Sequence, residues 1–172
     1  MQIRKATEED LDALMDLYAH ARDFMAANGN PHQWGDRRWP PRELIAADIA
    51  AGKSYICHEQ GRLLAAFYFD AGNCPEPGYD VLEAAWLAEG PYGVVHRIAA
   101  AENGRGAGTF CLEWAYSRCG HLRADTHADN TVMQNLLQKL GFVRCGTVLA
   151  DDGTPRLAYE KAPGLCRCDA CV

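Results

Sequence analysis

The chain has 172 residues, of which 48% are hydrophobic and 23% are charged, and its formal net charge is −6 at pH 7. This length suits one domain with a core of its own. Acidic residues outnumber basic ones, so we expect no basic surface of the kind that binds nucleic-acid phosphates. No apolar run reaches the length of a membrane span. The first residues also lack the apolar core of a signal peptide, so we expect a cytoplasmic protein with neither nucleic acid nor membrane as a partner.

The first half of the chain predicts two helices and three strands. Apolar residues at a spacing of three or four indicate the helices, and short β-branched and aromatic runs indicate the strands. Asp10 completes an imperfect capping box with Thr7. In chain order we expect a strand over 3–7, a helix capped by Thr7 and stopped by 28–31, a polar and aromatic loop over 32–40, a helix over 41–52, and a hairpin of strands over 54–58 and 63–69.

The second half predicts four more strands and two more helices. The segment 81–89 fits a strand and a short helix equally well, and both remain open. In chain order we expect a loop over 74–80, a strand over 93–100, a glycine-rich loop, a helix over 107–115, a strand over 121–126, a helix after Asn130, and a hairpin of strands over 142–149 and 156–161. This order indicates a mixed α/β domain over residues 1–161, built around one sheet, with a cysteine-rich tail over 162–172.

The strand over 93–100 runs into the glycine-rich loop Asn103-Gly104-Arg105-Gly106-Ala107-Gly108. Glycines at alternate positions leave backbone N–H groups bare, and the positive end of the following helix adds to them, so the loop suits a phosphate anion. Thr109 stands where the dinucleotide fingerprint needs its last glycine, and no Lys-Ser/Thr pair of a Walker loop follows. The sequence therefore predicts an anion-binding loop of another kind.

A second motif begins at Asn130 and ends at Gly141-Phe142, with Met133, Leu136 and Lys139 between them. In this order and separation the two segments resemble motifs A and B of the GNAT superfamily of N-acetyltransferases, Gln/Arg-x-x-Gly-x-Gly/Ala and Asn-x-x-Ala-x-x-Leu-Tyr-x-Lys-x-Gly-Phe. Gly106 and Gly108 match motif A, and Asn103 replaces its Gln or Arg. The resemblance extends over the chain up to about residue 161.

The resemblance implies a fold and a co-substrate. The fold is a mixed, mostly antiparallel sheet with helices on both faces and a splayed pair of parallel strands, and acetyl-coenzyme A (acetyl-CoA) lies in the opening. The backbone of Ile98 and Ala100 would pair with the pantetheine arm, and the N–H of Ile98 would donate to the thioester carbonyl. Asn130 would contact the pantetheine, and Arg105 is either a contact to phosphate or a solvated surface residue. The pyrophosphate would be held by the motif A loop, which consists of Asn103, Gly104, Arg105, Gly106, Ala107 and Gly108.

The activity implied by the resemblance is direct attack of a primary amine, of a small molecule or a peptide, on the thioester in a ternary complex. The amine must lose a proton, and histidine is suited to accept it near neutral pH. His96 is a candidate base on the central strand, with a packed strand histidine as an equal alternative. His127 follows the neighbouring strand, where Asp125 is placed to orient it, and a loop histidine that faces water is its alternative.

The general acid is not identified. Leu137 stands where motif B supplies a tyrosine, and nothing in their spacing singles out Tyr92 or Tyr116 as a replacement. A non-catalytic module that binds or senses acyl-CoA is therefore the alternative function.

The acceptor side is expected in the loop after the first helix. Gln33 and Trp34, with Tyr92 on the opposite wall, are the candidate acceptor-binding residues. For Trp34 and Trp39, packing of the loop onto the core is the alternative.

The cysteines at the C-terminal end raise the question of a metal. Cys166, Cys168 and Cys171 supply three thiols without a visible fourth ligand, so we expect a frayed tail and no metal site; a metal-responsive tail is the alternative. No histidine pair has ligand spacing. A homodimer through the last strands is left open.

Overall fold

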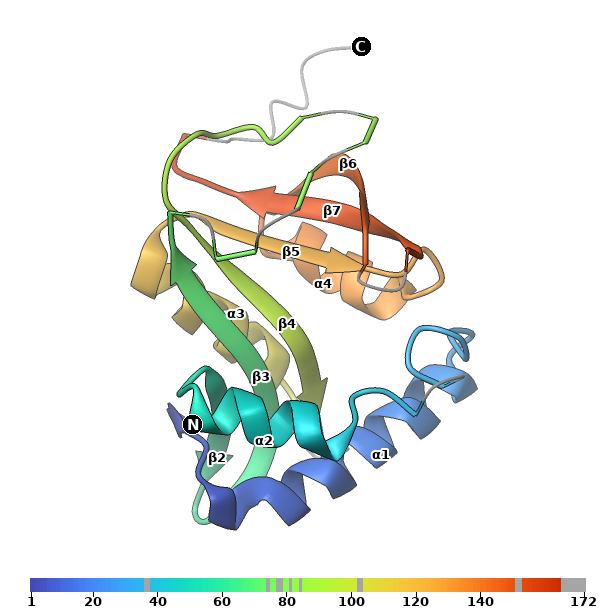
Figure 1. Ribbon diagram of the computed structural model, residues 1–172, viewed down its shortest axis with the longest axis vertical. Coiled ribbons are helices and arrows are strands. Elements are labelled where there is room, and N and C mark those ends of the chain that lie inside the picture. Colours follow the sequence, from blue (N-terminus) through green and yellow to red (C-terminus); the bar gives the residue numbers. More distant parts are fainter. Residues whose placement is uncertain are drawn as a thin grey trace. The chain divides into compact units, whose positions relative to one another are not determined.

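The computed structural model describes residues 1–35, 38–73, 75–76, 79–80, 82–83, 85–101, 104–150 and 153–164. They form one sheet of seven strands in the order β1-β2-β3-β4-β5-β7-β6 (Figure 1). Each predicted helix and strand is present, with ends that differ by a few residues. The bounds are β1 Gln2–Lys5, the 3-10 helix η1 Glu8–Asp10, α1 Leu11–Ala27, α2 Arg42–Ala50, β2 Ser54–Glu59, β3 Arg62–Gly72, β4 Tyr92–Ala100, α3 Ala107–Cys119, β5 Leu122–Thr126, α4 Thr131–Lys139, β6 Val143–Leu149 and β7 Pro155–Lys161.

The strand pairings confirm the predicted fold class. The pairs β1/β2, β2/β3, β5/β7 and β6/β7 are antiparallel, and β4/β5 is parallel. The parallel pairing joins Gly93 to Leu122 and Val94 to Arg123. The sheet is therefore mixed and mostly antiparallel, with one parallel pair.

The chain divides into two compact units. Unit 1 comprises Met1–Asp70 and Val95–Trp114, and unit 2 comprises Ala71–Val94 and Ala115–Val172. The prediction of a single domain over 1–161 stays a prediction. Of the part of the chain that the structure describes, no helix has both the length and the apolarity to cross a bilayer.

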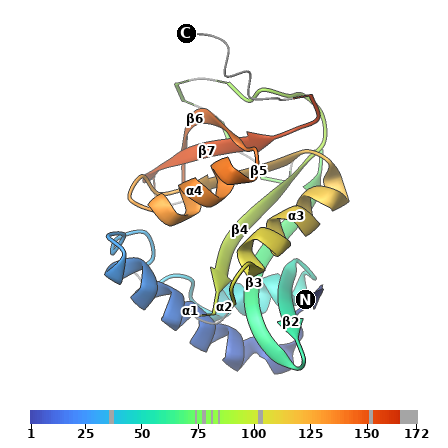
Figure 2. The same cartoon turned by 180° about the vertical axis from the view of Figure 1, so that it is seen from behind.

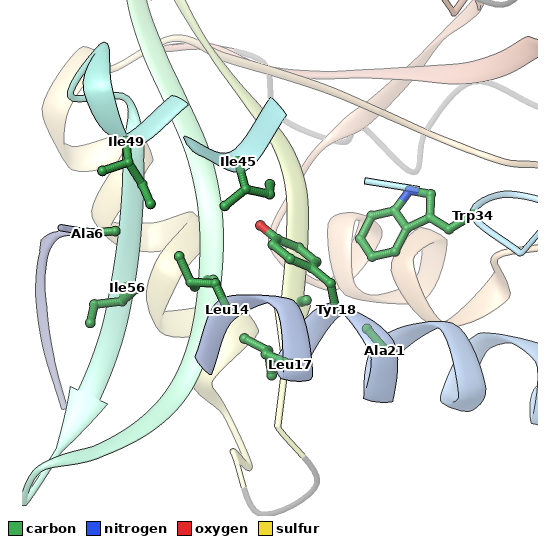
Figure 3. Packing of buried hydrophobic residues seen from close by; sticks show 11 residues of the cluster. Ala6, Leu14, Leu17, Tyr18, Ala21, Trp34, Ile45, Ile49 and Ile56 are labelled. Atoms are coloured by element: carbon green, nitrogen blue, oxygen red, sulfur yellow. The ribbon is translucent and has the colours of Figure 1, made fainter. Parts of the chain in front are cut away.

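The sheet of unit 1 carries helices on both faces. Ile56 and Ala66 pack with α1 and α2 in a buried cluster that includes Leu14, Tyr18 and Ile45 (Figure 3). The neighbouring strand residues point the other way because side chains alternate along a strand. Tyr55, Phe67 and Phe69 accordingly surround Trp114 of α3, with ring centroids 5.1, 5.9 and 5.7 Å from it. Figure 2 shows α3 along β3 and β4 on the side away from α2.

The start of unit 1 contains the expected capping box. The amide of Asp10 donates to the carbonyl of Thr7 at 3.0 Å, and the amide of Thr7 donates to Oδ2 of Asp10 at 2.8 Å. Arg4 adds two hydrogen bonds to the same carboxylate, at 2.7 and 2.8 Å. These bonds, above all those from Arg4, lower the pKa of Asp10 to about 2.

Unit 2 places α4 against its sheet, on the face seen in Figure 2. The side chain of Asn130 caps α4 by accepting a hydrogen bond from the amide of Met133 at 3.1 Å. Leu137 is fully buried, like Phe142 of the following turn. The segment 81–89 follows neither open alternative in the residues that the structure describes there, which form no helix and no strand.

Candidate functional site

The glycine loop lies between β4 and α3 and is folded tightly against β3. A Cβ built on Gly104 would stand 2.5 Å from the carbonyl oxygen of Leu64, so no other residue fits there without a shift of the backbone. The amide of Gly104 donates to the carbonyl of Ala101 at 2.8 Å, and its own carbonyl accepts from Ala107 at 2.9 Å. These contacts close the loop into the turn that precedes α3.

Gly106 prepares the start of α3. Its φ is +80°, in the left-handed region that favours glycine, and its carbonyl accepts the amide of Phe110 at 3.0 Å. The first backbone amides of an α-helix have no acceptor within the helix, because the carbonyl four residues before them lies outside it. In α3 the amide of Ala107 donates to the glycine loop instead, and the amide of Gly108 is not shielded by a side chain. The loop thus presents backbone N–H groups at the positive end of a helix of 13 residues, and its role as an anion site stays a prediction.

Arg97 bends β4 one residue before Ile98. Its φ is +52°, which costs about 1–2 kcal/mol for a residue with a Cβ. The bend interrupts the alternation of side chains, so both His96 and Arg97 contact Tyr68 of β3. The centroids of the His96 and Tyr68 rings are 5.8 Å apart, and the guanidinium carbon of Arg97 lies 4.5 Å from the Tyr68 centroid.

Two further residues of unit 1 hold Arg97. The hydroxyl of Tyr18 in α1 donates to the Arg97 carbonyl at 3.1 Å, and Nη2 of Arg97 donates to Oδ2 of Asp48 in α2 at 2.8 Å. Burial raises the pKa of Asp48, and the guanidinium opposes this shift. Burial also raises the pKa of Tyr18 far above its ordinary value, so both the hydroxyl and the ion pair are desolvated.

Sequence reasoning missed this arrangement. A left-handed φ at a non-glycine residue has no signature in the sequence, and Val94-Val95-His96-Arg97-Ile98 resembles an ordinary strand. Ile98 is half-buried on β4, and Ala100 is exposed at its end. Their predicted roles toward the pantetheine arm stay predictions.

The loop after α1 places its two candidate residues differently. Trp34 is buried against Tyr18, with an edge-on ring contact at 5.8 Å, as Figure 3 shows. Its neighbour Gln33 is half-buried and accepts a hydrogen bond from Nδ2 of Asn30 at 2.8 Å. Trp34 therefore attaches the loop to the core, and Gln33 lies on the part of the loop that remains partly exposed.

His127 lies in the turn before α4. Its Nδ1 accepts a hydrogen bond from the amide of Asp129 at 3.2 Å, and the carboxylate of Asp129 is 3.4 Å away. Asp125 accepts a hydrogen bond from the hydroxyl of Tyr79 at 2.8 Å. A neutral ring that accepts at Nδ1 carries its proton on Nε2, so His127 in this conformation has no second nitrogen ready to take a proton.

The tyrosines considered as acids both contact cations of unit 2. Tyr92 is buried, and its ring centroid is 4.0 Å from the guanidinium carbon of Arg123. The ammonium of Lys161 lies 4.3 Å from the centroid of Tyr116. Neither contact identifies a proton donor to a reacting group.

Two sets of predicted residues lie outside the described residues. They are Asn103 of the glycine loop and the cysteines of the tail, Cys166, Cys168 and Cys171. Within the described ranges, no group of three or more His, Cys, Asp or Glu residues is arranged to hold a metal ion.

The chain is similar to solved structures of acetyltransferases. A GNAT-family acetyltransferase from Streptococcus agalactiae is 35% identical over 94% of each chain, with a TM-score of 0.84. The yncA structure from Salmonella typhimurium, which holds its cofactor acetyl-CoA, is 20% identical over 99% of each chain, with a TM-score of 0.60. The ribosomal-protein-S18-alanine N-acetyltransferase from Escherichia coli is 15% identical over 92% of this chain and 91% of its own, also with a TM-score of 0.60. No protein-family model and no curated protein matches the chain.

Proposed function

Because the chain belongs to the GNAT family of acetyltransferases, we propose that it transfers the acetyl group of acetyl-CoA to the nitrogen of a primary amine. The glycine loop carries this proposal. Gly104 fits where no Cβ fits, Gly106 adopts a left-handed φ, and α3 begins immediately afterwards. Such a loop offers backbone N–H donors to the pyrophosphate of coenzyme A (CoA) without needing a particular side chain. The acetyl-CoA complex of yncA supports the choice of ligand.

We assign the binding of acetyl-CoA and the removal of the amine proton to residues of unit 1. Bound acetyl-CoA supplies an electrophilic carbonyl carbon and a thiolate leaving group. The loop amides hold the pyrophosphate, and the amide of Ile98 donates to the thioester carbonyl, where negative charge develops. We assign the base to His96, which lies on the bent strand two residues before Ile98 and next to the strained residue Arg97.

The acceptor is proposed to be an amine of a small molecule or a peptide. The Escherichia coli neighbour acts on the alanine of ribosomal protein S18, so the fold accommodates a protein amine. The net charge of −6 favours the approach of a cationic amine. We place the acceptor side at the loop that carries Gln33, with Trp34 fixing the loop to the core.

Release of free thiol from acetyl-CoA in the presence of an amine panel tests the activity. Gly106→Ala tests the loop, because it adds a methyl group among the phosphate-binding amides and strains a φ of +80°. Gly120→Ala is the matched control: its φ is +67°, it has open space around it, and it lies at the other end of α3. We expect Gly106→Ala to weaken CoA binding at least tenfold in calorimetry and Gly120→Ala to leave it unchanged, with similar losses of thermal stability. Equal CoA binding by the two variants would refute the assignment of the loop.

Leu137 favours a second candidate, a module that binds acyl-CoA without turning it over. The leucine is fully buried and carries no proton to donate where motif B supplies a tyrosine. CoA binding with no thiol release across the panel, unchanged by His96→Ala, would favour this module over the enzyme. Thiol release that falls in His96→Ala would exclude it.

A further inference from the structure

The bend of β4 is held by side chains from three different elements of unit 1. Tyr18 of α1 donates to the carbonyl of Arg97, Asp48 of α2 accepts from its guanidinium, and Tyr68 of β3 lies beneath that guanidinium. Tyr18 and Asp48 are both buried, with 1% and 8% of their surface exposed. A change at any of these positions therefore reaches the same backbone bend.

This arrangement is unfavourable for stability alone. A left-handed φ is strained at arginine, and an extended conformation of Arg97 would relieve this strain. The cluster also leaves Nε of Arg97 buried without a hydrogen-bond partner among the described residues. Strain that several buried polar groups maintain is found where the backbone conformation itself is used.

What the bend changes is the residue that follows it. A regular strand alternates its side chains and sends its amides into the ladder at fixed intervals. A residue in the left-handed region breaks this order, as it does in β-bulges, and re-aims the next peptide groups. The next residue is Ile98, whose amide our proposed function uses as the donor to the thioester carbonyl.

We propose that Tyr18, Asp48 and Arg97 are positioning residues that hold β4 bent and thereby aim the amide of Ile98 at the thioester carbonyl of acetyl-CoA. This inference rests on the proposed function but predicts its own, separate observation. A contact to the carbonyl is available to acetyl-CoA and is denied to CoA. The cluster should therefore control the preference for the acetylated ligand and leave the pyrophosphate contacts intact.

Two substitutions of Arg97 separate the backbone from the side chain. Both Arg97→Ala and Arg97→Gly remove the guanidinium, but only glycine adopts the left-handed φ without strain. We expect wild type and Arg97→Gly to bind acetyl-CoA about fivefold more tightly than CoA, which corresponds to one hydrogen bond, and Arg97→Ala to bind both alike. Affinity for CoA itself should stay within about threefold in all three, because the glycine loop is unchanged.

Turnover supplies the second readout. We expect kcat of Arg97→Ala to fall about 10²–10³-fold, as on loss of an oxyanion donor, and that of Arg97→Gly to fall less than about tenfold. KM for acetyl-CoA should stay nearly constant in Arg97→Gly and rise in Arg97→Ala by no more than its roughly fivefold loss of affinity for acetyl-CoA. Tyr18→Phe, which removes only the hydroxyl, should lower kcat in the same direction. Tyr55→Phe, on the opposite face of the same sheet, is its control and should not change kcat.

The outcomes distinguish the two levels of the proposal. Wild-type protein that prefers acetyl-CoA and releases no thiol with any amine would refute the enzyme and keep the positioning role. Equal ligand preference in wild type and Arg97→Ala would refute the positioning role, whatever the turnover. Equal losses in Arg97→Ala and Arg97→Gly would overturn it too, because the guanidinium itself would then be the group that acts. If Arg97→Ala does not fold, Tyr18→Phe decides by the same ligand ratio.

Discussion

Glu160→Gln tests the charged cluster at the centre of unit 2. Glu160 is fully buried on β7. Its Oε1 accepts from Nε2 of His121 at 2.6 Å and from Nε of Arg123 at 3.0 Å. Its Oε2 accepts from the amide of Leu87 and faces the thiol of Cys145 at 3.8 Å. Burial, followed by the carboxylate of Glu160, raises the pKa of Cys145 to about 12, so this thiol is a donor at neutral pH.

The loss of stability follows from these four donors. Glutamine has almost the same shape, but it replaces one accepting oxygen with a donating NH₂ group. In either orientation of the amide, Arg123 remains buried without its countercharge. If the NH₂ replaces Oε1, His121 and Arg123 also lose their acceptor; if it replaces Oε2, the amide of Leu87 is buried without one. Removing one partner of a buried ion pair typically costs about 3–5 kcal/mol. We expect Glu160→Gln to lower the free energy of unfolding by that amount, a large part of the total for a domain of this size.

Equilibrium unfolding in guanidinium chloride, followed by circular dichroism, measures the change. Glu59→Gln makes the same chemical substitution at a side chain that is 55% exposed and paired with the amino group of Met1 at 2.8 Å. It should change the free energy of unfolding only slightly, because water screens an exposed ion pair. If Glu160→Gln costs less than about 1 kcal/mol, with an unchanged slope, the inference that this carboxylate is essential to the charge balance of the cluster is wrong.

Two further predictions concern α1 and α4. Asp10→Asn removes the carboxylate charge from the capping box and from the bonds to Arg4, and should cost about 1–2 kcal/mol at pH 7; because the folded pKa of Asp10 is lowered from 3.8 to about 2, the difference from wild type in urea titrations should persist above pH 4 and shrink as the pH falls from 4 to 2. A difference as large at pH 2 as at pH 7 would show that the carboxylate charge is not responsible. Leu137→Tyr should lower the unfolding free energy by about 1–3 kcal/mol, because a larger side chain must enter a fully buried site, and should not increase thiol release; faster release would show that a tyrosine here reaches the reaction.

The elements of the fold could be predicted because their signals are local. The apolar spacing in α1, the β-branched run of β4 and the turn residues around each hairpin act within a few positions. The glycine loop was recognisable for the same reason, since its glycines and the helix after them are consecutive. Asn130 is likewise a local signal, because asparagine is a preferred N-cap residue and α4 begins directly after it.

The charged and strained features could not be predicted because they depend on contacts between distant segments. Arg123 and Glu160 are 37 residues apart and occupy strand positions that suit solvent-facing residues equally well. The carbonyl of Arg97, at the bend of β4, accepts a hydrogen bond from Tyr18, 79 residues earlier. For Trp34 the sequence allowed an acceptor wall or core packing, and only the contact with Tyr18 shows that the indole is buried.

The segment before β4 illustrates how a stretch without helix or strand is held in place. Arg123 lies between the rings of Trp86 and Tyr92, at 4.2 and 4.0 Å, and donates to the carbonyl of Ala88 at 2.9 Å, while Glu160 accepts from the amide of Leu87. Residues 85–91 are thus attached through side chains that belong to the core of unit 2. Proteases that need an unfolded peptide should therefore cut this stretch only as often as unit 2 opens as a whole, so the rate of cleavage there would report cooperative opening and not the looseness of a loop.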